Sequence, residues 1–163
     1  MSKQLTAEVI SATQFAAFGE LLENKTDQRR QDFSLQFAVG VQPQLWVNRL
    51  RAYTGRQILV DVMESHPHST QTFVPMQPGR CLIVVAPSGA DGKPDISALR
   101  AFVTKGGQGI SYRPNVWHYT FTSLDGPNEV VVIMGYGSAS GDTIIEPLVH
   151  PVAVNFQQGE HYE

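Results

Sequence analysis

The segment that decides the fold reads Met63-Glu64-Ser65-His66-Pro67-His68-Ser69-Thr70-Gln71-Thr72-Phe73-Val74-Pro75-Met76. Glu64 and His66 are two residues apart, so on a β-strand their side chains point to the same face. Pro67 cannot donate to a strand ladder and therefore ends this strand. After a tight turn a second strand begins at Gln71, whose side chain then faces Glu64 and His66. The segment predicts two strands that bring polar side chains together beside a turn.

Short runs rich in Val, Ile, Phe, Tyr and Thr continue on both sides of this segment. The predicted strands are 33–41, 45–53, 57–63, 71–76, 81–86, 101–104, 110–112, 117–122, 130–134 and 143–145. Clusters of Gly, Pro, Asn, Asp and Ser separate them at close spacing. Many short strands without intervening helices indicate an antiparallel sandwich or barrel. The sequence predicts a single all-β domain over residues 1–163.

One helix is predicted, near the start of the chain. Ser11 or Thr13 can cap a short amphipathic segment from about Thr13 to Phe18, and Gly19 ends it. The segment is too short to organise a fold. We expect it to pack outside the strands.

Composition excludes several classes of protein. Hydrophobic residues make up 42% of the chain and charged residues 17%, below the usual share of roughly 25%, which excludes disorder as the main state. The formal net charge is −3 and the basic residues are scattered, which argues against a nucleic-acid partner. No signal-peptide stretch or run of about 18 apolar residues is present, so we expect a cytoplasmic protein that does not enter the membrane.

The single cysteine, Cys81, begins an apolar run that ends at Ala86. A small buried thiol is the simplest interpretation, because thiolate chemistry needs an accessible, electropositive setting. A catalytic role for Cys81 is disfavoured.

Glu64, His66, Gln71 and His118 form a candidate metal-ligand set. Together they offer two imidazole nitrogens and two oxygens, a set suited to a borderline divalent cation such as Ni, Mn, Fe, Co or Zn. Without thiolates the site would be open, unlike a closed structural zinc site. The alternative is that His66 and His118 only satisfy turn backbone. His68 is disfavoured as a ligand because Thr72 and Phe73 could not supply the matching carboxylate, and His150 and His161 are expected to be solvated.

Three stretches of the sequence resemble the ureidoglycolate lyase family, formerly called ureidoglycolate hydrolases. They are His66 to Met76, Lys93-Pro94-Asp95-Ile96-Ser97-Ala98-Leu99-Arg100-Ala101-Phe102, and Tyr112 with Asn115-Val116-Trp117-His118. This family belongs to the cupin superfamily, whose first motif is His-x-His, four residues, then Glu, and whose second motif ends on a His. Glu64, His66, Gln71 and His118 occupy those four places. The resemblance implies a cupin-type double-stranded β-helix, a jelly-roll barrel with a short N-terminal helix.

The sequence departs from the family pattern in two regions. Family members carry Asn-Gly followed by Arg and Tyr where this chain has Asp32 to Val41, and His-Pro or Ala-Pro where it has Tyr119-Thr120. These departures lie where substrate contacts are expected.

The resemblance implies cleavage of (S)-ureidoglycolate to glyoxylate and urea in allantoin and purine degradation. The substrate carries a carboxylate and an α-hydroxyl, so a divalent metal, Ni²⁺ or Mn²⁺ with Zn²⁺ or Fe²⁺ as alternatives, can chelate both oxygens and lower the hydroxyl pKa. The expected catalytic residues are Glu64, His66, His118 and Tyr112. Glu64 is either a ligand or the proton shuttle, since a carboxylate enclosed in a barrel interior is a suitable base; if it is a ligand, Tyr112 or bound water moves the proton.

The expected substrate contacts are Arg51, Arg49, Gln71 and Trp117. Arg49 and Arg51 lie on one face of a predicted strand, and Arg51-Ala52 resembles an Arg-Ala pair of the family. A guanidinium can pair with the substrate carboxylate through two hydrogen bonds. The alternative is that both are solvated surface arginines.

Two other functions fit the same residues. The chain could be another metal-dependent cupin enzyme acting on a small hydroxy- or keto-acid, or a non-catalytic cupin that binds a small ligand.

The apolar strand content exceeds what one small barrel needs to bury, so a homodimer is also expected.

Overall fold

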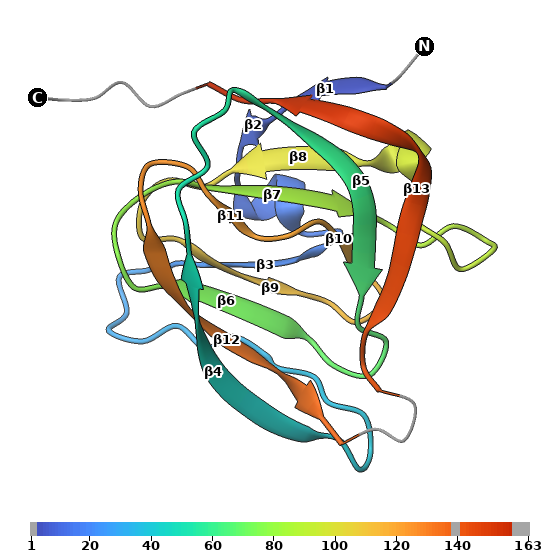
Figure 1. Cartoon of the computed structure of the whole chain (residues 1–163). Coiled ribbons are helices and arrows are strands. Elements are labelled where there is room, and N and C mark those ends of the chain that lie inside the picture. The colour runs from blue at the N-terminus through green and yellow to red at the C-terminus, as the bar shows by residue number, and fades with distance from the viewer. Residues whose placement is uncertain (1–2, 138–140, 158–163) are drawn as a thin grey trace, which may run out of the picture.

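The computed structural model describes residues 3–137 and 141–157 (Figure 1). In chain order the elements are β1 (Gln4–Thr6), β2 (Glu8–Val9), α1 (Ala12–Phe15), β3 (Gly19–Leu22), β4 (Gln42–Leu50), β5 (Gln57–Ser65), β6 (Gln71–Pro75), β7 (Cys81–Ala86), a 3₁₀ turn η1 (Ile96–Ala98), β8 (Arg100–Val103), β9 (Gly109–Tyr112), β10 (Trp117–His118), β11 (Thr122–Ser123), β12 (Asn128–Tyr136) and β13 (Ile144–Asn155). The all-β fold with one short N-terminal helix is confirmed. No helix among the described residues is long and apolar enough to cross a membrane.

The strands form two sheets. The larger has the order β1-β13-β5-β10-β7-β8-β2, with β11 also paired to β7, and the smaller has the order β3-β9-β6-β12-β4. Pairing is antiparallel except that β1 joins β13 and β2 joins β8 in parallel. Figure 1 shows the two sheets facing each other, with the long strands β5 and β13 running across β7 and β8. This is the barrel-like arrangement that the strand pattern predicts.

Strand β7 explains why the molecule has two cores. Cys81, Ile83 and Val85 point between the two sheets and pack with Phe73, whereas Leu82 and Val84 point the other way. The second core lies within the larger sheet, where β5 and β13 curl over β7 and β8. A strand that is buried on both faces has a continuous run of apolar residues in its sequence, and residues 81–86 form such a run. Cys81 is fully buried, and this burial raises the pKa of its thiol to about 12, as expected for an inert core cysteine.

The helix is shorter than predicted and ends before Gly19. Ser11 caps α1 by accepting a hydrogen bond from the backbone N–H of Gln14, and Phe15 is buried. Gly19 instead begins β3, where a Cβ would lie 1.9 Å from the carbonyl oxygen of Ser111. The glycine is therefore required by the close approach of β3 to β9, and not by a helix stop.

Other predictions of strand boundaries are wrong in informative ways. Residues 33–41 form no named strand; one isolated bridge joins Phe37 to Ser69. Strand β13 extends to Asn155 although it contains two prolines, because its register to β5 shifts between Pro147 and Val152, where a missing N–H is tolerated. The predicted strand 117–122 is broken into β10 and β11, and the short strands β1, β2 and β3 were not predicted.

Candidate metal centre

Three side chains that could bind a metal ion meet where β5 and β10 lie side by side. Glu64 near the end of β5 is the cross-strand partner of His118 on β10, so both side chains project from the same face of the sheet. His66 follows β5 directly, at the start of the turn containing Pro67. The turn before β10 is tied to it, because the backbone N–H of Asn115 donates to the carbonyl of His66 over 3.1 Å. Asn115 takes a left-handed conformation, with φ of 67°, that closes this turn.

The ligand atoms of Glu64, His66 and His118 lie within 4.8 Å of one another. Oε1 of Glu64 is 3.8 Å from Nε2 of His66 and also 3.8 Å from Nδ1 of His118. The two imidazole rings are tilted against each other with centroids 5.1 Å apart. Both histidines are buried, whereas the Glu64 side chain is 37% exposed. The enclosure that favoured Glu64 as a proton shuttle is therefore only partial.

Most of the buried polar atoms without partners belong to residues at or beside the cluster. Among the described residues, the buried side-chain atoms that make no hydrogen bond are Nε2 of His66, Nε2 of His118, Oε1 of Gln71, the Tyr112 hydroxyl and Nε1 of Trp117, and only Trp117 packs in the second core. Gln71 and Tyr112 are cross-strand partners in the smaller sheet, and Nε2 of Gln71 donates to Sδ of Met134, which leaves Oε1 as the open acceptor. Buried groups of this kind are normally paired. Two imidazole nitrogens, an amide oxygen and a carboxylate are donors that fit a divalent cation.

Burial sets the protonation states at the cluster. Burial and the neighbouring His66 lower the pKa of His118 to about 3, so His118 is neutral at physiological pH and keeps a lone pair for a ligand. Burial, and next the Glu64 carboxylate, raise the pKa of Tyr112 well above its ordinary value, so its hydroxyl stays protonated. The Tyr112 ring stacks on His118 with centroids 4.3 Å apart and planes at 10°. Tyr112 is thus positioned as a hydrogen-bond donor and not as a base.

Asp142 is a residue of the site that the sequence analysis missed. Its carbonyl oxygen lies 2.6 Å from Nδ1 of His66, and its carboxylate accepts from the backbone N–H of His68 over 2.7 Å. It lies 76 residues beyond His66 in the sequence. No local spacing could have indicated this contact.

Several predicted site residues lie apart from the cluster. Arg49 faces outward from β4 with its side chain 83% exposed and pairs with Glu129 at 3.1 Å, and Arg51 is exposed just after that strand. These positions favour the interpretation of both as surface arginines. Trp117 neighbours His118 on β10, points to the opposite face and packs in the second core.

The remaining histidines do not join the cluster. The hydrogen bonds of His68 within the described residues come from its backbone. Its N–H donates to the Asp142 carboxylate, and its carbonyl accepts from the N–H of Ala38. His150 is exposed as expected, although it lies within β13 and not in a tail. His161 lies outside the described residues.

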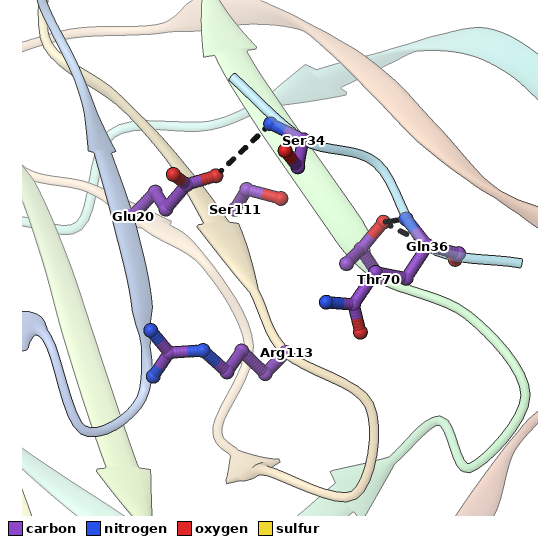
Figure 2. A pocket seen from close by; sticks show the side chains of 6 residues that line it. All are labelled: Glu20, Ser34, Gln36, Thr70, Ser111 and Arg113. Atoms are coloured by element: carbon purple, nitrogen blue, oxygen red, sulfur yellow. Dashed lines mark hydrogen bonds between the residues drawn. The ribbon is translucent and has the colours of Figure 1, made fainter.

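A separate polar pocket of about 140 Å³ lies on the outer face of the smaller sheet (Figure 2). It is lined by Glu20, Ser34, Gln36, Thr70, Ser111 and Arg113. Ser111 adjoins Tyr112 on β9, and successive strand residues point to opposite faces. The pocket and the cluster thus lie on opposite sides of β9.

Comparison with known proteins places the chain among enzymes of one kind. A family model described as ureidoglycolate lyase matches residues 2–154. A putative ureidoglycolate lyase of Agrobacterium fabrum is 33% identical over 158 residues, covering 94% of this chain and 96% of its own. A ureidoglycolate lyase of Brucella abortus is 31% identical over 140 residues, covering 79% and 81%. One from Schizosaccharomyces pombe is 37% identical over 101 residues, covering 58% and 52%.

Two solved structures resemble the chain at low sequence identity. A dTDP sugar isomerase of Desulfovibrio desulfuricans is 18% identical, with a TM-score of 0.46 and coverage of 82% of this chain and 83% of its own. The RmlC protein of Streptococcus suis is 12% identical, with a TM-score of 0.43 and coverage of 61% and 47%. The barrel-like fold is therefore defined by the strand order of this chain itself.

Proposed function

The chain belongs to the ureidoglycolate lyase family, and from this premise we propose that it uses the Glu64, His66 and His118 cluster to cleave (S)-ureidoglycolate into glyoxylate and urea. The activity is that of a carbon–nitrogen lyase, in allantoin and purine degradation. The observation that carries the assignment to this site is the meeting of Glu64, His66 and His118, whose ligand atoms lie within 4.8 Å of one another while Nε2 of each histidine is buried without a partner. Such donors fit a bound cation and substrate.

We propose that His66, Gln71 and His118 hold one divalent cation, with Glu64 beside them either as a fourth ligand or as the base. Imidazole nitrogens and carboxylate or amide oxygens suit Ni²⁺ or Mn²⁺, with Zn²⁺ or Fe²⁺ as alternatives. When bound, the cation supplies a Lewis acid that lowers the pKa of the substrate hydroxyl. Nε2 of His66, Nε2 of His118 and Oε1 of Gln71 are available as ligand atoms, because all three are buried and unpartnered.

The reaction needs one proton removed and one delivered. A base takes the proton of the α-hydroxyl, the C–O bond becomes a C=O bond as the carbon–nitrogen bond breaks, and the departing nitrogen receives a proton to give urea. Glu64 is the candidate base, since its carboxylate is the acidic group within 3.8 Å of both histidines. Its partial exposure also gives it access to water, through which the proton can leave.

Tyr112 is suited to the opposite task. Its protonated hydroxyl is buried without a partner beside His118, so it can donate a hydrogen bond to the departing nitrogen or to the carbonyl of the urea group. A donor that is already in place and shielded from water costs no reorganisation during the reaction. Glu64 and Tyr112 thus divide the proton transfer between an acceptor and a donor.

Product analysis tests the proposed activity. Purified protein supplied with Mn²⁺ or Ni²⁺ and (S)-ureidoglycolate should release urea and glyoxylate in equal amounts. Release of ammonia would indicate an amidohydrolase, and turnover of a different hydroxy- or keto-acid alone would indicate another cupin enzyme. Glu146→Gln serves as a control for loss of a carboxylate, because Glu146 pairs with Lys93 at 2.6 Å and, as the cross-strand partner of Met63, points to the face of the sheet opposite Glu64.

We further propose that the protein is a cytoplasmic homodimer. Strand β4 is the edge of the smaller sheet and exposes Leu45 at 64% and Val47 at 50%, a surface that a second copy could cover. The only cysteine is buried and unpaired, as is typical of proteins from reducing compartments. Light scattering at micromolar concentration should give twice the chain mass, and a Val47→Lys variant should give the chain mass; a monomeric wild-type protein would exclude the dimer.

A further inference from the structure

We propose that Asp142 is a positioning residue that holds His66 in the tautomer and orientation needed to bind a cation through Nε2. This inference rests on the proposed role of His66 as a ligand. It goes beyond that role because Asp142 is outside the ligand set and approaches His66 from a distant part of the chain.

The main-chain carbonyl of Asp142 determines which ring nitrogen of His66 carries hydrogen. A carbonyl oxygen can only accept, and it lies 2.6 Å from Nδ1, so Nδ1 must be the donor. Neutral His66 then presents an unprotonated Nε2, the buried atom without a partner that lies 3.8 Å from the Glu64 carboxylate. A ligating histidine whose other nitrogen donates to an oxygen is the usual arrangement at metal sites.

The side chain of Asp142 anchors that carbonyl in place. One carboxylate oxygen accepts from the backbone N–H of His68 over 2.7 Å, and the other accepts from the Ser69 hydroxyl. Asp142 is only 8% exposed, so both hydrogen bonds are shielded from water. Asp142 therefore makes two hydrogen bonds to the turn that follows His66, through its carboxylate, and a third to the His66 ring, through its carbonyl oxygen.

The Ser69 hydroxyl also makes a hydrogen bond to strand β12. Its Oγ accepts from the backbone N–H of Gly135 on β12 over 2.9 Å. A Cβ at Gly135 would lie 2.7 Å from the Cβ of Ser69, so the strand carries glycine where the serine packs against it. Asp142 thus links His66 in the larger sheet's turn to β12 of the smaller sheet through Ser69.

A positioning role of Asp142 and a purely stabilising role predict different results when Asp142 is replaced. If Asp142 only stabilised the fold, its loss would lower stability while the folded molecules kept the same His66 ring state. If it positions His66, its loss frees the carbonyl, and folded molecules contain a mixture of His66 tautomers. The second outcome is visible without any cation.

The test is nitrogen-15 NMR of the histidine rings in metal-free protein at pH 8, with measurement of Mn²⁺ affinity. Wild-type His66 should show a protonated Nδ1 and an unprotonated Nε2. Asp142→Ala should show mixed tautomers and a 10- to 100-fold loss of Mn²⁺ affinity, as is usual when the partner of a ligating histidine is removed. Asp142→Asn, which keeps an oxygen acceptor for the His68 N–H, should lose less. Circular dichroism establishes that each variant is folded.

His68→Ala is the matched control, because Asp142 accepts from the backbone of His68 and not from its ring. It should leave both the tautomer and the affinity unchanged. A wild-type tautomer and wild-type affinity in folded Asp142→Ala would overturn the proposal. Should Asp142→Ala fail to fold, Ser69→Ala repeats the test by removing one of the two anchors. An ordered Nδ1–H tautomer in a wild-type protein that cleaves no ureidoglycolate would refute the proposed function and leave this inference standing.

Discussion

Replacing Tyr112 by phenylalanine should change stability and activity in opposite directions. Tyr112 is 1% exposed, and its hydroxyl is buried without a partner. An unsatisfied buried polar group costs about 1–3 kcal/mol. Phenylalanine removes that group and keeps the ring that stacks on His118. We therefore expect metal-free Tyr112→Phe to be more stable by about 1 kcal/mol, which raises Tm by about 2–4 °C for a chain of this size.

The same change should reduce the rate of cleavage. Loss of one donor that acts on the transition state typically costs about 10²–10³-fold in kcat, and Tyr112 is proposed to be such a donor. Urea denaturation followed by circular dichroism measures stability in the metal-free protein. The initial rate of urea release measures activity after loading with Mn²⁺.

Tyr53→Phe is the control for this pair of measurements. The Tyr53 hydroxyl donates to the carbonyl of Gln57 over 2.7 Å, so its removal should destabilise the fold by about 0.5–1.5 kcal/mol and leave the rate unchanged. A Tyr112→Phe variant that is destabilised by more than about 1 kcal/mol would show that the hydroxyl has a structural partner. An unchanged rate would remove Tyr112 from the mechanism.

Three further predictions concern the cluster. His66→Ala and His118→Ala should each lose bound metal and activity while remaining folded, and His68→Ala should lose neither; equal losses in all three would place the ligands elsewhere. The pKa of His118 falls from 6.5 in the unfolded chain to about 3 in the fold, so the unfolded state binds more protons between these two pH values. The free energy of unfolding of metal-free protein should therefore decrease as pH falls from about 6.5 to about 3. A free energy that does not change over this range, or a pH dependence that is the same in His118→Gln, would contradict this. Glu64→Gln should retain metal and lose at least about 10²-fold in rate if Glu64 is the base, whereas weak metal binding with activity restored by excess metal would make it a ligand.

Local sequence patterns were enough to predict most of the strands and the proximity of Glu64 and His66. These two residues are two apart, so strand alternation places their side chains on the same side. His118 was found because a second turn precedes it. The apolar run from Cys81 to Ala86 predicted a strand with a buried cysteine, and both are confirmed.

What the sequence did not predict depends on tertiary contacts. Strands β1, β2 and β3 have four residues or fewer, too few for a periodic signal, and exist because longer strands offer them an edge. The alternating pattern of residues 33–41 has no such edge beyond the bridge at Phe37. The contact of Asp142 with His66 spans 76 residues. The outward direction of Arg49 follows from its pairing opposite Glu129 in the sheet register, which the order of residues in the chain does not reveal.

The central claim is that one divalent cation, held by His66, Gln71 and His118 beside Glu64, is needed to cleave ureidoglycolate. Titrating metal-free protein with Mn²⁺ while measuring both bound metal and the rate of urea release tests it directly. The rate should rise in proportion to bound metal and reach its maximum at one ion per chain. Full activity in the metal-free protein, or saturation with metal without release of urea, would contradict the claim.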